Sequence, residues 1–425
     1  MRILSVFAIS VMIASYSSSV QSFVSGKLDT LLETEQTNYY SRSRIEQQVD
    51  INWRNIKNTL NAGLQFDLKH EIIEDFSQNN DQNISENKQQ INLLFVSHEA
   101  ADINYTLGRF NRSDFLGYYT LDGVSAKYSK QNWDTHFHAG KPLQIEDYIT
   151  IDADRIYGID INHHTNHNNN SIVKKTNSHI GWQQIQDNTR QNYIHMGISA
   201  NGELSKHDYN QLELFFNGSY LTENKSAESI NAGAQVQSKE LGMARIAYNS
   251  WKPEQANLSF KEQFYSVYAN GEQSILQADL FHNYKWGQQY YIRGRKVWRE
   301  FGNNGFGTTI GFEQKLSSKE NSGWLAQWDS LILKGDIIHS VYLGLNKNIS
   351  ATFRGHLNTA LQYTDNKSTD TNSLLALEAV VEQMLNSALF IDFNARYIYN
   401  QNFENEYRIG FRLSYRFDDR IWSGK

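Results

Sequence analysis

The sequence predicts an all-β fold, a single antiparallel transmembrane β-barrel of about 18–22 strands. Apolar and polar residues alternate with a period of two from Phe23 to Phe417, which is the repeat of a strand and not of a helix. The chain also opens with a short apolar segment typical of a secretory signal peptide. Aromatic residues make up 13% of the chain although its mean hydropathy is -0.60, as expected when half of each strand is polar.

The N-terminus has the three parts of a signal peptide. Met1 and Arg2 give a positive start, Ile3–Ala14 is mostly apolar, and Ser15–Ser22 is small and polar. The apolar part is too short to cross a bilayer as a helix. We therefore expect residues 1–22 to be a cleaved signal peptide, residues 23–417 to form the barrel and residues 418–425 to be a short polar tail.

Segments with strand alternation follow one another along the whole mature chain. In order they are Val24–Glu33, Ile45–Arg54, Leu60–Lys69, Gln90–Ser97, Ala101–Phe110, Leu121–Ser129, Asn132–Gly140, Asp154–His163, Ser178–Gln186, Asn192–Ala200, Gln211–Tyr220, Asn231–Gln237, Leu241–Asn249, Phe260–Tyr268, Ile275–Tyr284, Tyr290–Arg299, Phe306–Lys315, Trp324–Leu333, Ile337–Leu345, Phe353–Tyr363, Leu374–Met384, Leu389–Tyr399 and Glu406–Phe417. Leu374–Met384 has a composition that would also suit a helix. Single-chain bacterial barrels usually close with an even number of strands, which bounds the count.

A secreted soluble β-protein is the alternative to a barrel. A soluble sandwich of this length needs two sheets around a shared interior, usually with Gly/Pro-rich turns, and it has edge strands to protect. The chain has only two prolines, and each segment carries a single thin apolar face. Because backbone groups in hydrocarbon must find partners within the protein, a closed barrel is the all-β solution in a membrane.

The links between these segments alternate in length, as they do in bacterial barrels. Ile56–Asn58 is short and is the expected form of a periplasmic turn, whereas Ser77–Lys88 is long and Asn-rich and indicates an outer loop. The His- and Asn-rich patch His163–Asn170 indicates a solvated loop. Asn111–Thr120 has two interpretations, a constriction loop folded into the lumen or an ordinary outer loop on the surface.

The last predicted strand has a fully apolar face. Its alternate residues are Tyr407, Ile409, Phe411, Leu413, Tyr415 and Phe417. This run resembles the C-terminal assembly signal of Gram-negative outer-membrane proteins, which ends on an aromatic residue. Here eight residues follow Phe417, and Trp422 among them could share the role. The resemblance implies an outer-membrane barrel inserted by the barrel-assembly machinery.

A second resemblance rests on two short motifs. Leu107-Gly108-Arg109 ends one predicted strand, and Leu121-Asp122-Gly123-Val124 begins the next. The pair is similar to porin-type and alginate-export-type barrels, in which the corresponding region often shapes the channel.

The polar face of the C-terminal strands is rich in arginine. The candidate pore-lining residues are Arg293, Arg295, Arg299, Arg354, Arg396, Arg408, Arg412, Arg416 and Asp392. Stacked on neighbouring strands, the arginines would form a basic ladder that favours anions. In the alternative, they pair with inward carboxylates and only keep the lumen wet. Those carboxylates are Asp279, Glu313, Asp329 and Asp392.

The N-terminal strands carry inward acids, which would give the lumen two oppositely charged walls. They are Asp29, Glu33, Glu46, Asp50 and Asp67. Arg109 breaks the alternation, since it shares a face with Ile103, Tyr105 and Leu107. We expect it at the membrane rim, where a long cationic side chain can snorkel.

Candidate catalytic residues are few. His136 and His138 lie on one polar face with Asp134 and could bind a metal or serve acid–base chemistry, although such a group is more often simply part of a polar lumen face. No GxSxG, HExxH or Gly-rich phosphate loop occurs, and without cysteine there is no disulfide or thiolate metal site. We expect a protein that is not an enzyme and that uses no cofactor or metal.

These observations predict a porin-like channel in the cell outer membrane for passive diffusion of small polar or anionic solutes. The alternatives are an export conduit for a polysaccharide or other polymer, and an outer-membrane enzyme or adhesin with a closed lumen. The expected partners are outer-membrane lipid and lipopolysaccharide, the barrel-assembly machinery and a small polar solute, with a homo-oligomer possible. The net charge of -6 argues against nucleic acid as a partner.

Overall fold

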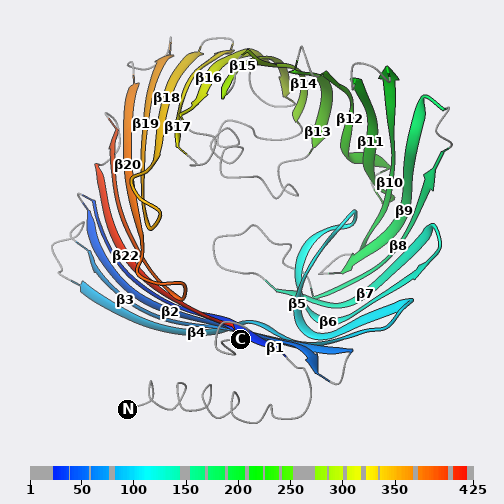
Figure 1. The fold of residues 1–425 in the computed structure, drawn as a ribbon, viewed down its shortest axis with the longest axis horizontal. Helices are drawn as coiled ribbons and strands as arrows, with labels where there is room; N and C mark the ends of the chain where they lie inside the picture. Colours follow the sequence, from blue (N-terminus) through cyan, green and yellow to red (C-terminus); the bar gives the residue numbers. More distant parts are fainter. Residues whose placement is uncertain are drawn as a thin grey trace.

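The computed structural model is a single closed antiparallel barrel of 22 strands (Figure 1). It describes residues 23–418 except 38, 57–58, 76–81, 144–153, 168–170, 187–189, 206–209, 224, 239–241, 252–272, 285–286, 300–303, 317–321, 334–335, 367–371 and 401–404. Each strand pairs with its neighbours in the sequence, and β1 pairs with β22 to close the ring. The predicted fold class is confirmed.

The strands are long, as expected for elements that cross a bilayer at a tilt. They are β1 (Phe23–Gln36), β2 (Tyr40–Ile56), β3 (Leu60–Asp75), β4 (Gln82–Glu99), β5 (Ile103–Asp114), β6 (Gly117–Lys130), β7 (Trp133–Leu143), β8 (Arg155–Asn166), β9 (Val173–Gln186), β10 (Arg190–Ser205), β11 (Asn210–Leu221), β12 (Ser226–Ser238), β13 (Gly242–Trp251), β14 (Gln273–Asn283), β15 (Gln288–Arg299), β16 (Gly305–Lys315), β17 (Gly323–Leu333), β18 (Asp336–Asn348), β19 (Phe353–Asn366), β20 (Asn372–Met384), β21 (Leu389–Asn400) and β22 (Glu406–Asp418). The predicted strand Phe260–Tyr268, the predicted signal peptide and residues 419–425 lie outside the described residues.

Two predicted loops are partly wrong. β4 begins at Gln82, inside the predicted outer loop Ser77–Lys88, and β8 continues through Asn166, inside the predicted solvated loop His163–Asn170. Both extensions are polar. The extension of β4 pairs with β3 as far as Asp75, and the extension of β8 pairs with β9 as far as Lys175. Backbone pairing satisfies N–H and C=O groups whatever the side chains are, so these strands continue without an apolar signal.

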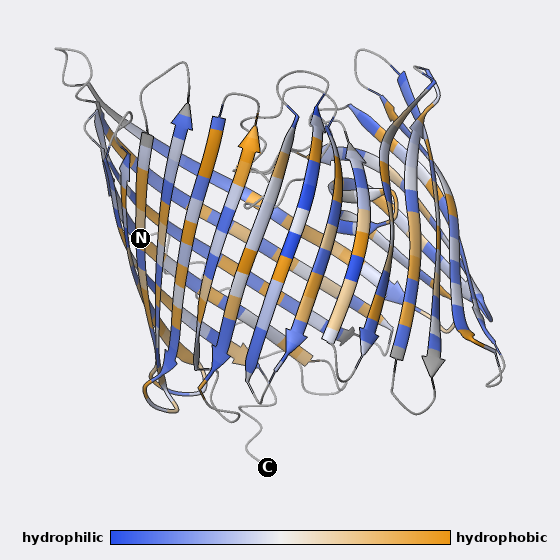
Figure 2. Ribbon diagram, turned by 90° about the horizontal axis from the view of Figure 1, so that it is seen from above, coloured by the Kyte–Doolittle hydropathy of each residue, from blue (hydrophilic) through white to orange (hydrophobic). Residues whose placement is uncertain are grey.

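The apolar side of the wall is the exposed one. Along β22, Tyr407, Ile409, Phe411 and Leu413 are all exposed, and Ser414 between them and the strand end is buried. Figure 2 shows the same alternation of apolar and polar positions along many strands. A soluble protein has the opposite arrangement, so this surface is suited to an apolar solvent. Among the residues that the structure describes, no helix has the length and apolar character needed to span a membrane.

The two ends of the chain are held together by backbone pairing and by charge. β1 and β22 pair from Ser25↔Asp418 to Gln36↔Tyr407. Glu35 is buried at this seam, where it accepts hydrogen bonds from Tyr40 at 2.5 Å and from Arg408 at 2.8 Å. The seam therefore leaves no open edge between the first and last strands.

Candidate functional site

The hairpin of β5 and β6 leaves the wall and bends into the ring (Figure 1). β4 and β5 pair only from Leu94↔Arg109 to Glu99↔Asn104, whereas β5 and β6 stay paired as far as Asp114↔Gly117. The tip of this hairpin therefore extends beyond the sheet edge that β4 offers. Of the two interpretations of Asn111–Thr120, the structure supports a segment folded into the lumen.

A row of glycines marks the corner where the hairpin bends. Gly108, Gly123 and Gly140 lie opposite one another on β5, β6 and β7. Gly108 has a φ of 111°, a conformation that residues with a Cβ atom rarely adopt. A Cβ atom on Gly123 would clash with the backbone of Ala139. Without side chains at this level, the strands can approach and turn inward.

Arg109 fixes the same corner from the outer side. Its guanidinium donates two hydrogen bonds of 2.7 Å to Asp122 on β6 and a third to the carbonyl oxygen of Ile91 on β4. The bond to Ile91 gives a backbone carbonyl of β4 a hydrogen-bond partner just beyond the part of β4 that pairs with β5. Arg109 does lie on the outward face, as expected, but it is an ion-paired corner residue. The two motifs that resemble porin-type barrels are the residues of this corner.

The underside of the hairpin packs on the inner face of the wall in an apolar cluster. Its buried members are Phe110, Tyr119, Leu121, Ile156, Ile185, Tyr193 and Leu221, from β5, β6, β8, β9, β10 and β11. The same strands expose Ile159 and Trp182 at alternate positions, on their other face. The hairpin therefore covers apolar residues on the inside of this part of the wall, whereas Ile159 and Trp182 remain exposed on its outside.

Buried polar contacts complete the docking. Arg112 forms an ion pair with Asp114 and lies 3.2 Å from Nε2 of His138 on β7. The Tyr119 hydroxyl lies 2.8 Å from the carbonyl oxygen of Leu116 and 3.1 Å from Oε1 of Gln183 on β9. Charged groups are costly to bury unless they are paired, so these contacts hold the hairpin in one position.

Of the two histidines singled out in the sequence, His138 belongs to this docking surface, and His136 lies half-buried two residues earlier on the same face of β7. His138 is fully buried beneath the hairpin, next to Arg112. The described part of the chain contains no group of three His, Asp or Glu side chains that could hold a metal ion. Sequence reasoning missed Arg112 and Gln183, whose only signal was a position on the polar face.

The candidate pore-lining arginines fall into three sectors of the wall. Arg293, Arg295 and Arg299 are on β15, Arg354 is on β19, and Arg396, Arg408, Arg412 and Arg416 are on β21 and β22. Neither β14 nor β16 contributes an arginine opposite those of β15. The register thus gives separate groups and not one continuous ladder. That these residues line an open pore stays a prediction.

Several of these arginines have carboxylate partners. Arg293 donates to Asp279 at 2.6 Å, and Arg354 lies 3.8 Å from Glu382. Asp392 faces Arg412 across β21 and β22. Glu313 and Asp329 carry no arginine opposite them on β15 or β16. Pairing therefore accounts for part of the arginine set.

The acids of the N-terminal wall are also partnered. Asp29 pairs with Lys27, and Glu33 and Glu46 lie 3.2 Å and 3.7 Å from Arg44. The two remaining candidates accept hydrogen bonds from amides, Asp50 from Asn52 and Asp67 from Asn92. Lys27 and Arg44 bring positive charge within 4 Å of Asp29, Glu33 and Glu46, so the field of this wall is weaker than its acid content indicates.

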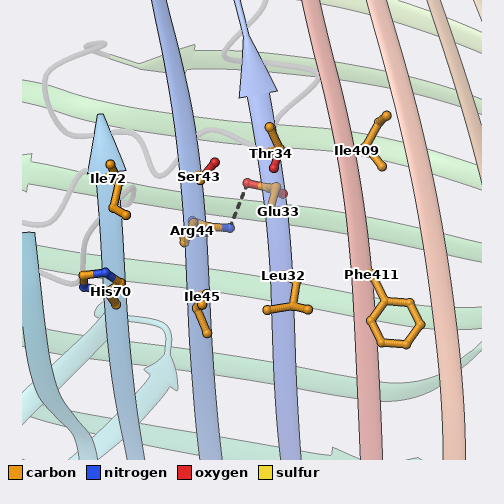
Figure 3. Close-up of a pocket in the computed structure, with 10 residues that line it drawn as sticks. All are labelled: Leu32, Glu33, Thr34, Ser43, Arg44, Ile45, His70, Ile72, Ile409 and Phe411. Atoms are coloured by element: carbon orange, nitrogen blue, oxygen red, sulfur yellow. Dashed lines mark ion pairs between the residues drawn. The ribbon is translucent and has the colours of Figure 1, made fainter. Parts of the chain in front are cut away.

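A groove of about 370 Å³ lies on the wall where β22, β1, β2 and β3 meet (Figure 3). Most of its lining belongs to the outward face, including Leu32, Ile45, Ile72 and Phe411, which are exposed. Figure 3 also shows the ion pair between Glu33 and Arg44. The groove opens on the outward face of the barrel and is separate from the infolded hairpin.

No protein-family model and no curated protein matches the chain. Several solved structures are similar to it. The translocation pore of the P pilus usher PapC is 7% identical over 93% of this chain and 99% of that chain, with a TM-score of 0.47. OccK7 (OpdD) of Pseudomonas aeruginosa is 8% identical over 94% and 99%, with a TM-score of 0.42. OccAB4 of Acinetobacter baumannii is 6% identical over 93% and 98%, with a TM-score of 0.43.

Proposed function

We propose that this chain is an outer-membrane channel through which small polar or anionic solutes diffuse passively, with no catalytic activity. One observation carries the proposal. The wall is a closed ring whose exposed outward residues are apolar, and its inner face carries hydrogen-bonded and charged side chains. In a membrane, that arrangement places acyl chains outside and water inside.

The height of the apolar band supports this placement. Tyr407 and Phe417 are the first and last aromatic residues on the outward face of β22. Ten residues of strand span about 33 Å, and a tilt of about 40° reduces this to about 25 Å. That height matches the apolar band of outer-membrane barrels, about 25 Å.

Aromatic contacts at both ends of the wall support it further. Tyr284, Tyr290, Phe312 and Trp324 form a chain of ring contacts 4.7–6.4 Å apart at one end of β14–β17. Tyr397 and Tyr407 make a contact of 4.7 Å at the other end, on β21 and β22. Aromatic side chains gather at the two membrane–water interfaces, where one part is apolar and the other wet.

The β15 sector is the part of the proposed lumen that favours anions. Arg293, Arg295 and Arg299 all lie on one face of β15. The infolded hairpin takes up space inside the ring and narrows the path. A narrowed lumen with three arginines on one strand favours anionic solutes over cationic ones.

Single-channel recording in a planar bilayer tests this function. We expect stepwise conductance in neutral salt and a reversal potential, under a salt gradient, that shows a modest preference for anions. A strongly anion-selective, gated and narrow pore would favour the polymer conduit instead. The absence of any current from folded protein would contradict the channel and favour a closed lumen.

A further inference from the structure

We propose that the inner wall from β9 to β13 binds a neutral oligosaccharide as it passes through the channel. The inference rests on the proposed channel function and names a solute class for it. The inference depends on a row of residues that we call the amide belt, after the three asparagines in it. Its members, one on each strand, are His179, Gly197, Asn217, Asn231 and Asn249.

The register places the amide belt at a single level of the wall. His179 and Asn217 lie opposite Gly197 on either side, Asn217 lies opposite Asn231, and Asn231 lies opposite Asn249. Neighbouring strands are about 4.8 Å apart, so five strands span about 19 Å across the wall. That length accommodates a chain of several linked sugar rings.

The rows on both sides of the amide belt are also uncharged. They consist of His195, Ser219 and Ser229 on one side and of Asn177, Ser199, Phe215, Gly233 and Ala247 on the other. The row beyond the second of these is charged, with Lys175, Glu213 and Arg245. An ion that lost part of its water here would find no opposite charge among these residues, whereas a neutral solute has no such requirement.

The groups that the patch does offer are those that hydroxyl-rich molecules use. A side-chain amide presents both a donor and an acceptor, as a sugar hydroxyl does. Oδ1 of Asn231 and Nε2 of His195 are buried in the wall and have no hydrogen-bond partner among the described residues. Buried unsatisfied polar atoms favour an ordered water that completes their bonding, and such a water can bridge the wall to a hydroxyl of the sugar.

An aromatic platform stands at one end of the amide belt. Phe115, at the tip of the infolded hairpin, stacks on His179 with ring centroids 3.7 Å apart, and it is 52% exposed. A large apolar side chain exposed inside a polar lumen is costly unless something packs on it. A sugar ring has an apolar C–H face that suits such a platform and hydroxyl edges that suit the amides.

Block of the single-channel current tests the inference. The probes are a neutral linear glucose hexasaccharide, a uronic-acid hexasaccharide of equal length and a glycine–serine hexapeptide with blocked ends. We expect the neutral sugar to reduce the current of the wild-type channel in a saturable way and at lower concentration than the other two. The inference would be overturned if the channel conducts but the neutral sugar does not block it, or if the peptide or the uronic-acid sugar blocks it at a lower concentration. The channel function would still stand in either case.

Variants locate the effect. Asn217→Ala/Asn231→Ala removes two amides, and we expect block to require about thirtyfold more sugar, since each of the two lost hydrogen bonds contributes about 1 kcal/mol. Asn231→Asp, nearly equal in shape, adds a charge and should weaken block as well. Asn358→Ala on β19, six strands beyond the last strand of the amide belt, is the matched control, and the sugar should block it as it blocks wild type. Equal block of all four proteins would contradict the amide belt, and absence of any current would overturn the proposed function itself.

Discussion

Arg112 is the residue on which the position of the infolded hairpin depends most. Its side chain is buried, pairs with Asp114 on the same strand and contacts His138 on the wall. Removing one member of a buried ion pair leaves the other charged without a partner, at a cost of about 3–5 kcal/mol. Removing both members can be nearly neutral, because no charge is then left buried. The single substitution should therefore weaken docking, and the double substitution should leave it nearly unchanged.

We expect Arg112→Met to loosen the hairpin and to raise the mean conductance and the current noise of single channels. Arg112→Met/Asp114→Leu should restore a quieter channel, since both charges are gone. Ser113→Ala alters the exposed residue between them and serves as the control, with the conductance of wild type. Traces of Arg112→Met that match those of wild type would show that this ion pair does not hold the hairpin.

At the scale of elements, the corner at β5–β7 determines whether the hairpin enters the lumen. Gly123 lies against the backbone of Ala139 and Gly140, so an added side chain has no flexible neighbour to displace. Gly294 on β15 is the contrasting case, with nothing within 4 Å of the position a Cβ atom would take. Two glycines in the same kind of wall thus differ in the space around them.

We expect Gly123→Val to reduce the yield of folded barrel severely on refolding into lipid vesicles, and Gly294→Val to fold like wild type. The folded fraction can be read from the gel mobility of heated and unheated samples. Backbone clashes cannot be relieved by a change of rotamer, which is the physical reason for the difference. Equal yields from the two variants would mean that the corner tolerates a side chain.

The elements were predictable from the sequence wherever one face of a strand meets an apolar medium. That condition holds for β20, whose composition also suited a helix, because its partners β19 and β21 impose the strand period. The condition does not hold at the polar ends of β4 and β8, so their full length was not predictable. Infolding of the hairpin is indicated in the sequence by Phe110 and Leu121, which put apolar side chains on the face that is otherwise polar. The arginine groups could not be placed, because stacking depends on the stagger between strands and not on alternation within one strand.

At the scale of the whole molecule, closure of the ring is what gives the wall an inside and an outside. The pairing of β1 with β22 removes the last free edge and fixes every alternate residue to one of the two faces. The hairpin then occupies the inside, and the amide belt and the arginine sectors share the rest of the inner wall. Channel function, solute class and membrane location all require that the two faces meet different solvents.

Solvent access at neighbouring residues of one strand tests that requirement most directly. Arg412 and Leu413 are adjacent on β22 and lie on opposite faces, and the chain has no cysteine of its own. In lipid vesicles, a water-soluble maleimide should label Arg412→Cys rapidly and leave Leu413→Cys unlabelled until detergent is added. Labelling of both variants at the same rate in intact vesicles, or labelling of Leu413→Cys alone, would contradict a wall with acyl chains outside and water inside.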